Sequence, residues 1–274
     1  MLNKFRTALL MLHSVMNKKL IPYLIVVTAL LVIPSSLIYA EAPKENVISF
    51  AKGKWDSAQW LSLRLPNQEH AVPLVQNPSS LGTTDATFTE TDYGKERDNA
   101  LLQYDMGTSE GQIELTFSLG KGFNHYSSPG ICLFPKVKDG TFETGIAAFV
   151  SSYGMDLWYE YGEGSVMKYR NIGQLARWTT PFEKHILRCH FSKAKRSIAL
   201  QVDNSDIVVF LFVGDPRLSF IPQEINSLIA LWGCHGVCDF YSLKIIDAQK
   251  TPDAPGLLPF YAKDPSEKNP SPGK

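Results

Sequence analysis

The chain has 274 residues, of which 27 are Lys or Arg and 27 are Asp or Glu, so its formal net charge is zero. This balance argues against a strongly basic nucleic-acid-binding protein, and no nucleic-acid partner is expected. Apolar residues make up 44% and charged residues 20%, which is typical of a globular protein and not of a disordered one.

Residues 1–40 are predicted to form a signal peptide. A pair of lysines at 18–19 precedes an apolar run over 20–40 that ends in Ala40. A basic start, an apolar middle and a small residue at the cleavage point are typical of a secretory signal. The leader is long, and Met16 is an alternative start that would give it an ordinary length.

Two alternatives stay open for this segment. Cleavage after Ala42 would place small residues at positions −1 and −3, but Pro43 would then follow the cut. The apolar run of about 20 residues is also just long enough to span a bilayer as an uncleaved anchor. We therefore expect an extracytoplasmic protein, secreted or periplasmic. The alternative is a protein anchored by an N-terminal transmembrane segment, which would be its only membrane contact.

After residue 40 the sequence is typical of an all-β domain. Short runs of β-branched and aromatic residues alternate with Gly, Asn, Asp and Pro, and we find no amphipathic helix. In QIELTFS, residues 112–118, the strict alternation predicts Ile113, Leu115 and Phe117 on the buried face of a strand. Further strands are predicted for residues 47–50, 71–75, 100–104, 130–134, 145–151, 155–161, 185–191, 197–202, 207–212, 228–233 and 239–246.

These strands predict one antiparallel, two-sheet β-sandwich over residues 41–248. Two segments lack the alternation. Residues 77–99 are polar and rich in Thr and Asp, which predicts a long loop, with one edge strand within it as the alternative. Residues 249–274 combine repeated prolines with charged residues, so we predict a Pro-rich flexible C-terminal tail.

The four cysteines fall into two groups. Cys132 and Cys189 lie in apolar strand patterns and are predicted to be buried thiols. Cys234 and Cys238 flank a histidine within five residues, and in an exported chain a short-loop disulfide is our first interpretation. Free thiols and a metal site are the alternatives. A structural zinc needs four ligands, and no second Cys/His cluster supplies them, so no metal is predicted here.

The second half of the chain resembles concanavalin A-like and laminin G-like domains. HILR at residues 185–188 is similar to their "W-H-x-[LV]" strand, and SIALQVDN at 197–204 to their strand that ends in "vDG" before a hairpin turn. The runs 228–232 and 239–245 resemble the closing strands. We therefore suspect a member of this jelly-roll superfamily, with the likeness concentrated in residues 183–247.

The resemblance implies a glycan-related role, because many such domains bind or cleave polysaccharide on the concave outer face of one sheet. On the strand 155–161, Asp156, Trp158 and Glu160 are predicted to face outward. An exposed indole ring can pack on the CH groups of a pyranose, and carboxylates can accept hydrogen bonds from sugar hydroxyls. The alternative is an ordinary sheet surface with one partly covered tryptophan.

Arg188 and His190 are predicted to share the outer face of their own strand, and complete the candidate ligand-binding face. A structural hydrogen bond is the interpretation we prefer for His185, at the start of that strand. Calcium is common in these folds. Asp203, Asn204 and Asp206 could contribute to such a site but fit a hairpin turn equally well. We predict no cofactor, with Ca²⁺ as the alternative.

No catalytic signature is present. A glycosidase needs two carboxylates about 5–10 Å apart, whereas Asp156 and Glu160, four residues apart on one strand, would be about 13 Å apart. A polysaccharide lyase would need a base and an acid beside a cation. His125, Tyr126 and the run 168–170 are the residues that could supply them, together with Arg188 and His190 on the candidate face.

The leading prediction is thus an exported jelly-roll domain that binds a polysaccharide, a cell-surface glycan or another cell-surface partner. The first alternative is a polysaccharide lyase or glycoside hydrolase that uses the same concave face. The second is a structural envelope protein without a small ligand.

Overall fold

The computed structural model describes residues 45–83, 99–122, 128–151, 154–175, 183–203, 209–212, 225–233 and 236–247. The chain separates into two units, Met1–Ala42 and Pro43–Lys274, and every described residue lies in the second. The predicted signal peptide and C-terminal tail lie outside the described residues, so both stay predictions. Within the described ranges, no helix is long and apolar enough to cross a membrane.

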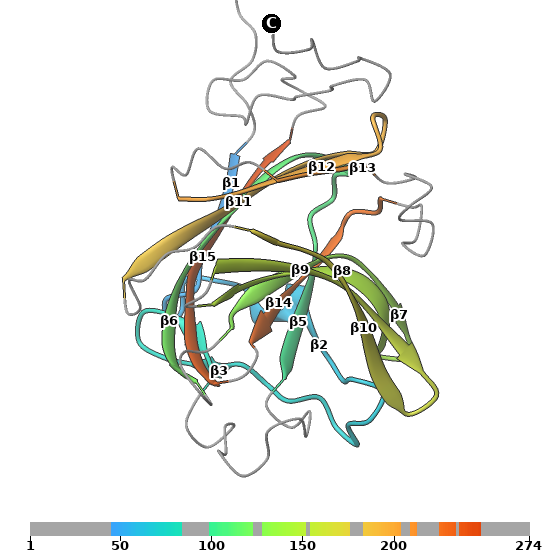
Figure 1. Ribbon diagram of the computed structural model, residues 1–274. Coiled ribbons are helices and arrows are strands. Elements are labelled where there is room, and N and C mark those ends of the chain that lie inside the picture. The colour runs from blue at the N-terminus through green and yellow to red at the C-terminus, as the bar shows by residue number, and fades with distance from the viewer. Residues whose placement is uncertain are drawn as a thin grey trace, which may run out of the picture. The chain divides into compact units, whose positions relative to one another are not determined.

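The described residues form two antiparallel sheets, which confirms the predicted all-β sandwich (Figure 1). The eight-stranded sheet has the order β13-β12-β11-β6-β15-β4-β3, and β1 pairs with β15 outside this path. Its strands are β1 (Glu45–Ser49), β3 (Val75–Gln76), β4 (Leu81–Gly82), β6 (Glu110–Gly122), β11 (Lys184–Ser192), β12 (Ser197–Val202), β13 (Val209–Phe212) and β15 (Gly236–Asp247).

The seven-stranded sheet has the order β10-β9-β8-β7-β14-β5-β2. Its strands are β2 (Trp60–Leu63), β5 (Ala100–Asp105), β7 (Gly130–Lys138), β8 (Thr141–Ser151), β9 (Gly154–Glu163), β10 (Val166–Leu175) and β14 (Leu228–Gly233). A single turn of 3-10 helix, η2 (Ser57–Gln59), precedes β2 and is capped by the Asp56 side chain, which accepts a hydrogen bond from the Ala58 N–H.

The two sheets share one hydrophobic core. Ile113, Leu115 and Phe117 on β6 are fully buried in it, as their alternation predicted, and so is Leu157 on β9. The prediction of a strand over 71–75 was largely wrong, because only its last residue is in a strand. Pro73 has no N–H to donate to a ladder, which explains why the strand cannot extend over it.

The residues that carry the family resemblance contact one another. Asp203, at the end of β12, accepts hydrogen bonds from His185 Nδ1 and from the Ile186 N–H, each at 2.9 Å. Its backbone has φ +50° and its carbonyl accepts a bond from the Arg188 guanidinium. His185 therefore has the structural role that we preferred for it, which is to tie the start of β11 to the end of β12.

These bonds also bear on the calcium alternative. Both carboxylate oxygens of Asp203 already accept hydrogen bonds, and Asn204 and Asp206 lie outside the described residues. Across the ranges that the structure describes, no group of three or more His, Cys, Asp and Glu side chains could hold a metal ion.

Three of the four cysteines are described, and all three are free, buried thiols: Cys132, Cys189 and Cys238. Cys132 and Cys189 are as predicted. Cys238 is a free thiol in this structure, and Cys234, the disulfide partner that we predicted for it, lies outside the described residues. Cys238 Sγ instead lies in the core, 3.7 Å from Thr83 Oγ1. Burial raises the pKa of the Cys238 thiol to about 12.

Candidate functional site

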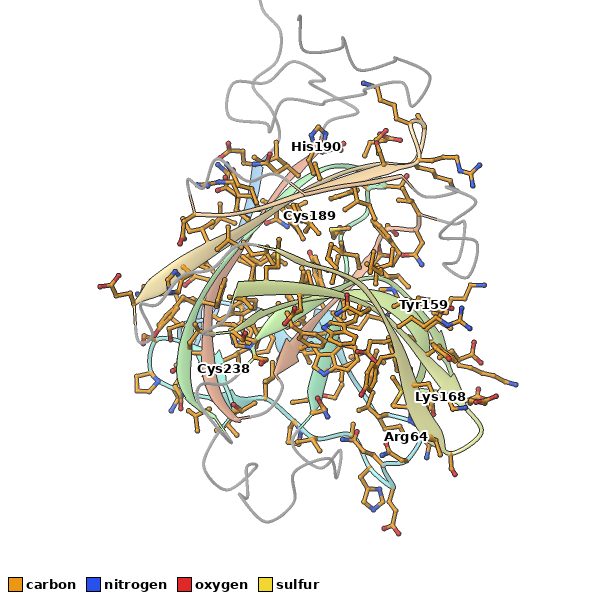
Figure 2. The ribbon with its side chains drawn as sticks, viewed as in Figure 1. Arg64, Tyr159, Lys168, Cys189, His190 and Cys238 are labelled. Atoms are coloured by element: carbon orange, nitrogen blue, oxygen red, sulfur yellow. The ribbon has the colours of Figure 1, made fainter. Side chains whose placement is uncertain are left out.

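The five residues of the predicted ligand-binding face do not lie on one face. Asp156, Trp158 and Glu160 belong to β9 in the seven-stranded sheet, whereas Arg188 and His190 belong to β11 in the eight-stranded sheet. Both groups alternate with residues of the shared core, so they project from opposite outer sides of the sandwich. Figure 2 shows His190 far from the β9 residue Tyr159. The prediction of a single composite face was therefore wrong.

On β11, Arg188 forms an ion pair within its own sheet and His190 is buried. Arg188 Nε donates to Glu114 Oε1 at 3.0 Å, across the β11–β6 ladder. The next charged pair in this row joins Lys244 to Glu45 at 2.9 Å. His190 is only 7% exposed. Lys168, Tyr169 and Arg170 lie on β10, in the other sheet. Arg188 and His190 therefore cannot form the predicted lyase site together with these three residues.

The centre of the outer face of the seven-stranded sheet is closed. Small residues, Ala147, Cys132 and Ala230, occupy its central row on β8, β7 and β14. The rings of Phe142 and Trp232 fill the space above them, with centroids 5.3 Å apart in a T-shaped contact. This second apolar cluster, which we call the outer cluster, consists of Leu63, Leu65, Leu101, Cys132, Phe142, Ala147, Phe149, Ala230 and Trp232. Among the residues that the structure describes, these side chains therefore fill the middle of this face.

The accessible part of the same face lies at its edge, on β9 and β10. Tyr169 is 64% exposed, and its ring meets the half-buried Trp158 ring edge-on at a centroid distance of 4.9 Å. Trp158 in turn packs against the outer cluster, which fixes it in place. Asn171 is exposed and pairs with Trp158 across the β10–β9 ladder. We call Trp158, Tyr169 and Asn171 the edge platform.

Two carboxylates flank the edge platform on β9. Asp156 is half-buried, and burial raises the pKa of its carboxyl. Glu160 is the register partner of Tyr169 and is only 9% exposed. Burial, and then the charge of Glu160, hold the pKa of the Cys132 thiol well above its ordinary value. Glu160 therefore lies close to the outer cluster, whereas Asp156 is the carboxylate more accessible to a ligand.

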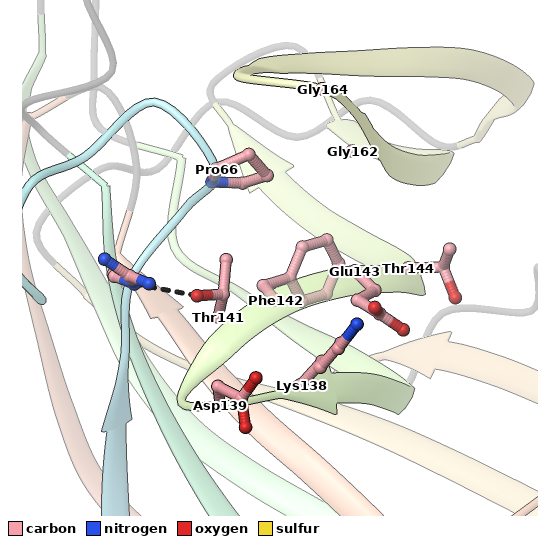
Figure 3. A pocket seen from close by; sticks show the side chains of 10 residues that line it. Pro66, Lys138, Asp139, Thr141, Phe142, Glu143, Thr144, Gly162 and Gly164 are labelled. Atoms are coloured by element: carbon pink, nitrogen blue, oxygen red, sulfur yellow. Dashed lines mark hydrogen bonds between the residues drawn. The ribbon is translucent and has the colours of Figure 1, made fainter.

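A pocket of about 570 Å³ lies farther along the same face, where the β7–β8 and β9–β10 hairpins end (Figure 3). The two hairpins form two sides of the pocket, and the residues that follow β2 form a third. Arg64 forms a parallel bridge with Thr141, and Pro66 lies over Gly162. Five polar or charged residues and one glycine among its lining matter for ligand binding: Arg64, Lys138, Asp139, Thr141, Glu143 and Gly162.

No protein-family model and no curated protein matches this chain. Among solved structures, the exoplasmic/lumenal domain of VIP36 in its Ca²⁺/Man2-bound form is similar, with a TM-score of 0.44 and 12% identity over 68% of this chain and 87% of that one. The CBM2 module of the evolved Dit of Lactobacillus casei BL23 phage J-1 is similar with a TM-score of 0.44 and 11% identity, over 75% of this chain and 98% of that one. The carbohydrate-binding module CBM66 from Bacillus subtilis has a TM-score of 0.36 and 13% identity, over 53% of this chain and 81% of that one. These likenesses are weak in both TM-score and identity, and they carry no functional argument.

Sequence reasoning missed β2, β10 and the pocket. It did not predict Val166–Leu175 as a strand, and it began the strand corresponding to β8 at Gly145. Two signals could have found the hairpins. Asp139-Gly140, with φ +50° and +71°, is the dipeptide preferred in a two-residue β-hairpin turn, and Gly164, with φ +65°, marks the turn between β9 and β10.

Proposed function

We propose that this protein is an exported carbohydrate-binding protein, and that a polysaccharide or cell-surface glycan lies on the edge platform. The observation that carries the proposal is the exposed ring of Tyr169, which is supported edge-on by Trp158 at 4.9 Å. A large aromatic side chain in this setting offers a flat apolar surface that matches the CH face of a sugar ring.

The polar surroundings suit a sugar better than an apolar partner. The amide of Asn171 can both donate and accept hydrogen bonds, and the half-buried Asp156 carboxylate can accept them from hydroxyls. The Trp158 ring is already held by the outer cluster and in turn limits the motion of Tyr169. Binding would therefore order few additional side chains, and this preorganisation favours affinity.

The same geometry favours binding over hydrolysis. Asp156 and Glu160 lie four residues apart on the same face of β9, which corresponds to about 13 Å along an extended strand. This separation exceeds the spacing of about 5–10 Å across a scissile glycosidic bond. Release of reducing sugar or unsaturated uronate by the purified protein would overturn the non-catalytic proposal.

Replacing Tyr169 with alanine is expected to weaken glycan binding by about tenfold or more, because the exposed ring face contributes most of the contact area. The full chain would be screened against neutral and acidic soluble polysaccharides by affinity electrophoresis, and the strongest binder measured by titration calorimetry. Tyr169→Phe keeps the ring and should retain most of the affinity. Val166→Ala, which removes an exposed apolar side chain from the same hairpin, is the matched control. Equal affinities for the wild type and Tyr169→Ala would contradict the platform.

Export is tested separately. In cells that secrete the protein, we expect the mature chain to begin at Glu41, because cleavage after Ala40 removes the predicted signal peptide. N-terminal sequencing of the extracytoplasmic protein measures this directly. A chain that retains residues 20–40 and sediments with membranes would instead support the anchored alternative.

A further inference from the structure

We propose that the pocket beside the edge platform binds the uncharged sugar at the end of a glycan whose next residues lie on Trp158 and Tyr169. This inference rests on the proposed function and extends it, because it assigns a second subsite and a class of ligand. Four observations support it: the position of the pocket, its charges, its hydrogen bonds and its rigid walls.

The pocket continues the platform along β9. Gly162, which lines the pocket, is two residues beyond Glu160 on the same face of the strand. On β10 their register partners are Met167 and Tyr169. Two residues of a strand span about 7 Å, so a chain molecule that lies over Tyr169 along β9 reaches the pocket directly.

The charges of the pocket are balanced. Arg64 and Lys138 are positive, and Asp139 and Glu143 are negative, and all four side chains are exposed. No ion pair found within the described ranges involves any of them. Sugar hydroxyls both donate and accept, so they can bind carboxylates and cations in the same pocket. An anionic ligand would gain from the two cations but would be repelled by Asp139 and Glu143.

Arg64 is positioned before any ligand arrives. Its Nε donates to Thr141 Oγ1 at 2.7 Å, and the dashed line in Figure 3 marks this bond. The bond uses one of the five N–H donors of the guanidinium, so its two terminal nitrogens stay available to neighbouring hydroxyls. A guanidinium fixed in this way loses little freedom on binding.

The walls of the pocket are also rigid. The Asp139-Gly140 turn and the turn at Gly164 are both tight hairpin turns with positive φ values. Phe142 lines the pocket and is itself fully buried in the outer cluster. The volume of about 570 Å³ falls within the range of about 300–1,000 Å³ that is common for small-molecule sites.

The test uses isosteric variants that remove charge without removing the fold. Asp139→Asn keeps a residue that tolerates positive φ, and Glu143→Gln keeps the shape of the side chain. We expect each to weaken binding of a neutral hexasaccharide by about tenfold, because a charge-assisted hydrogen bond becomes a neutral one. Glu69→Gln, an exposed glutamate outside the pocket, is the matched control and should bind like the wild type.

The probes are maltohexaose, cellohexaose and mannohexaose, with hexagalacturonate as the acidic counterpart. In the ¹⁵N-labelled full chain, the amide signals of Gly140, Gly162 and Gly164 should shift on addition of the neutral probe that binds. They should shift less in the Glu143→Gln variant. Tighter binding of hexagalacturonate than of every neutral probe would overturn the assignment to an uncharged sugar.

Failure of the pocket and failure of the platform give different results. If Tyr169→Ala abolishes binding but the pocket variants bind normally and the three glycine signals stay fixed, this inference is wrong and the proposed function stands. If the glycine signals shift but Tyr169→Ala has no effect, the pocket binds sugar without the platform, and their continuity is wrong. If neither site responds to any polysaccharide or hexasaccharide, both proposals are wrong.

Discussion

Replacing Phe142 with alanine is expected to lower the free energy of unfolding by about 3–5 kcal/mol. The ring is fully buried in the outer cluster, on the side of the seven-stranded sheet that faces away from the shared core. Alanine would leave a cavity above the small residues of the central row and remove the T-shaped contact with Trp232. In a domain of this size, that loss corresponds to a decrease in Tm of roughly 6–20 °C.

Urea denaturation followed by far-UV circular dichroism measures this loss, and calorimetry gives the change in Tm. Tyr169→Ala is the matched control, because it removes an exposed aromatic ring from the same side of the same sheet. It should change stability by no more than about 0.5 kcal/mol. If Phe142→Ala costs less than about 1 kcal/mol, the outer cluster is not a packed core, and a ligand groove across the sheet becomes tenable again.

Phe142 and Tyr169 differ in their exposure, and this difference shows which aromatic rings of the face a ligand could reach. Aromatic side chains at the centre of the outer face are buried in the outer cluster, whereas the Tyr169 ring at the edge is accessible. Aromatic content alone therefore does not identify a sugar-binding face. What matters is whether the ring is buried among other side chains, as the rings of Phe142 and Trp232 are in the outer cluster.

The sequence predicted the facing of side chains well, because alternation is a local property of each strand. Asp156, Trp158 and Glu160 were expected to face outward, and they do, since the alternate residues Met155, Leu157 and Tyr159 lie in the shared core. What local alternation cannot supply is the sheet to which a strand belongs. The ladder from β11 to β6 pairs Arg188 with Glu114, residues far apart in sequence, and this long-range pairing separates Arg188 from β9.

The strand β10 was missed for a different reason. It lies at the edge of the sheet, where both exposed and half-buried residues occur on either side, so hydrophobic alternation is weak. A register shift between Asn171 and Gly173 also breaks its period. Tyr169 therefore appeared in the sequence only as part of a polar run, although it is the most exposed large aromatic residue in the described ranges.

Replacing Gly145 with alanine is the second change with a large expected effect. A Cβ built on Gly145 would lie 2.2 Å from Cys132 Sγ and 3.2 Å from Phe142 Cε2. Neither neighbour has room to withdraw, because both are fully buried in the outer cluster. We expect overpacking to lower the free energy of unfolding by about 1–3 kcal/mol, measured by urea denaturation.

A double-mutant cycle with Cys132→Ala identifies the cause of that loss. If the sulfur atom is the obstacle, Cys132→Ala should relieve the clash, and the two changes should couple favourably by about 0.5–3 kcal/mol. Gly130→Ala is the matched control, because its Cβ would meet the Ala148 carbonyl oxygen at 2.4 Å, a backbone atom that Cys132→Ala does not move. Additive effects of Gly145→Ala and Cys132→Ala would contradict the predicted clash. Coupling would show that the absence of a side chain at Gly145 is what allows Phe142 and Cys132 to close the centre of this face, which leaves the edge platform and the pocket as its accessible parts.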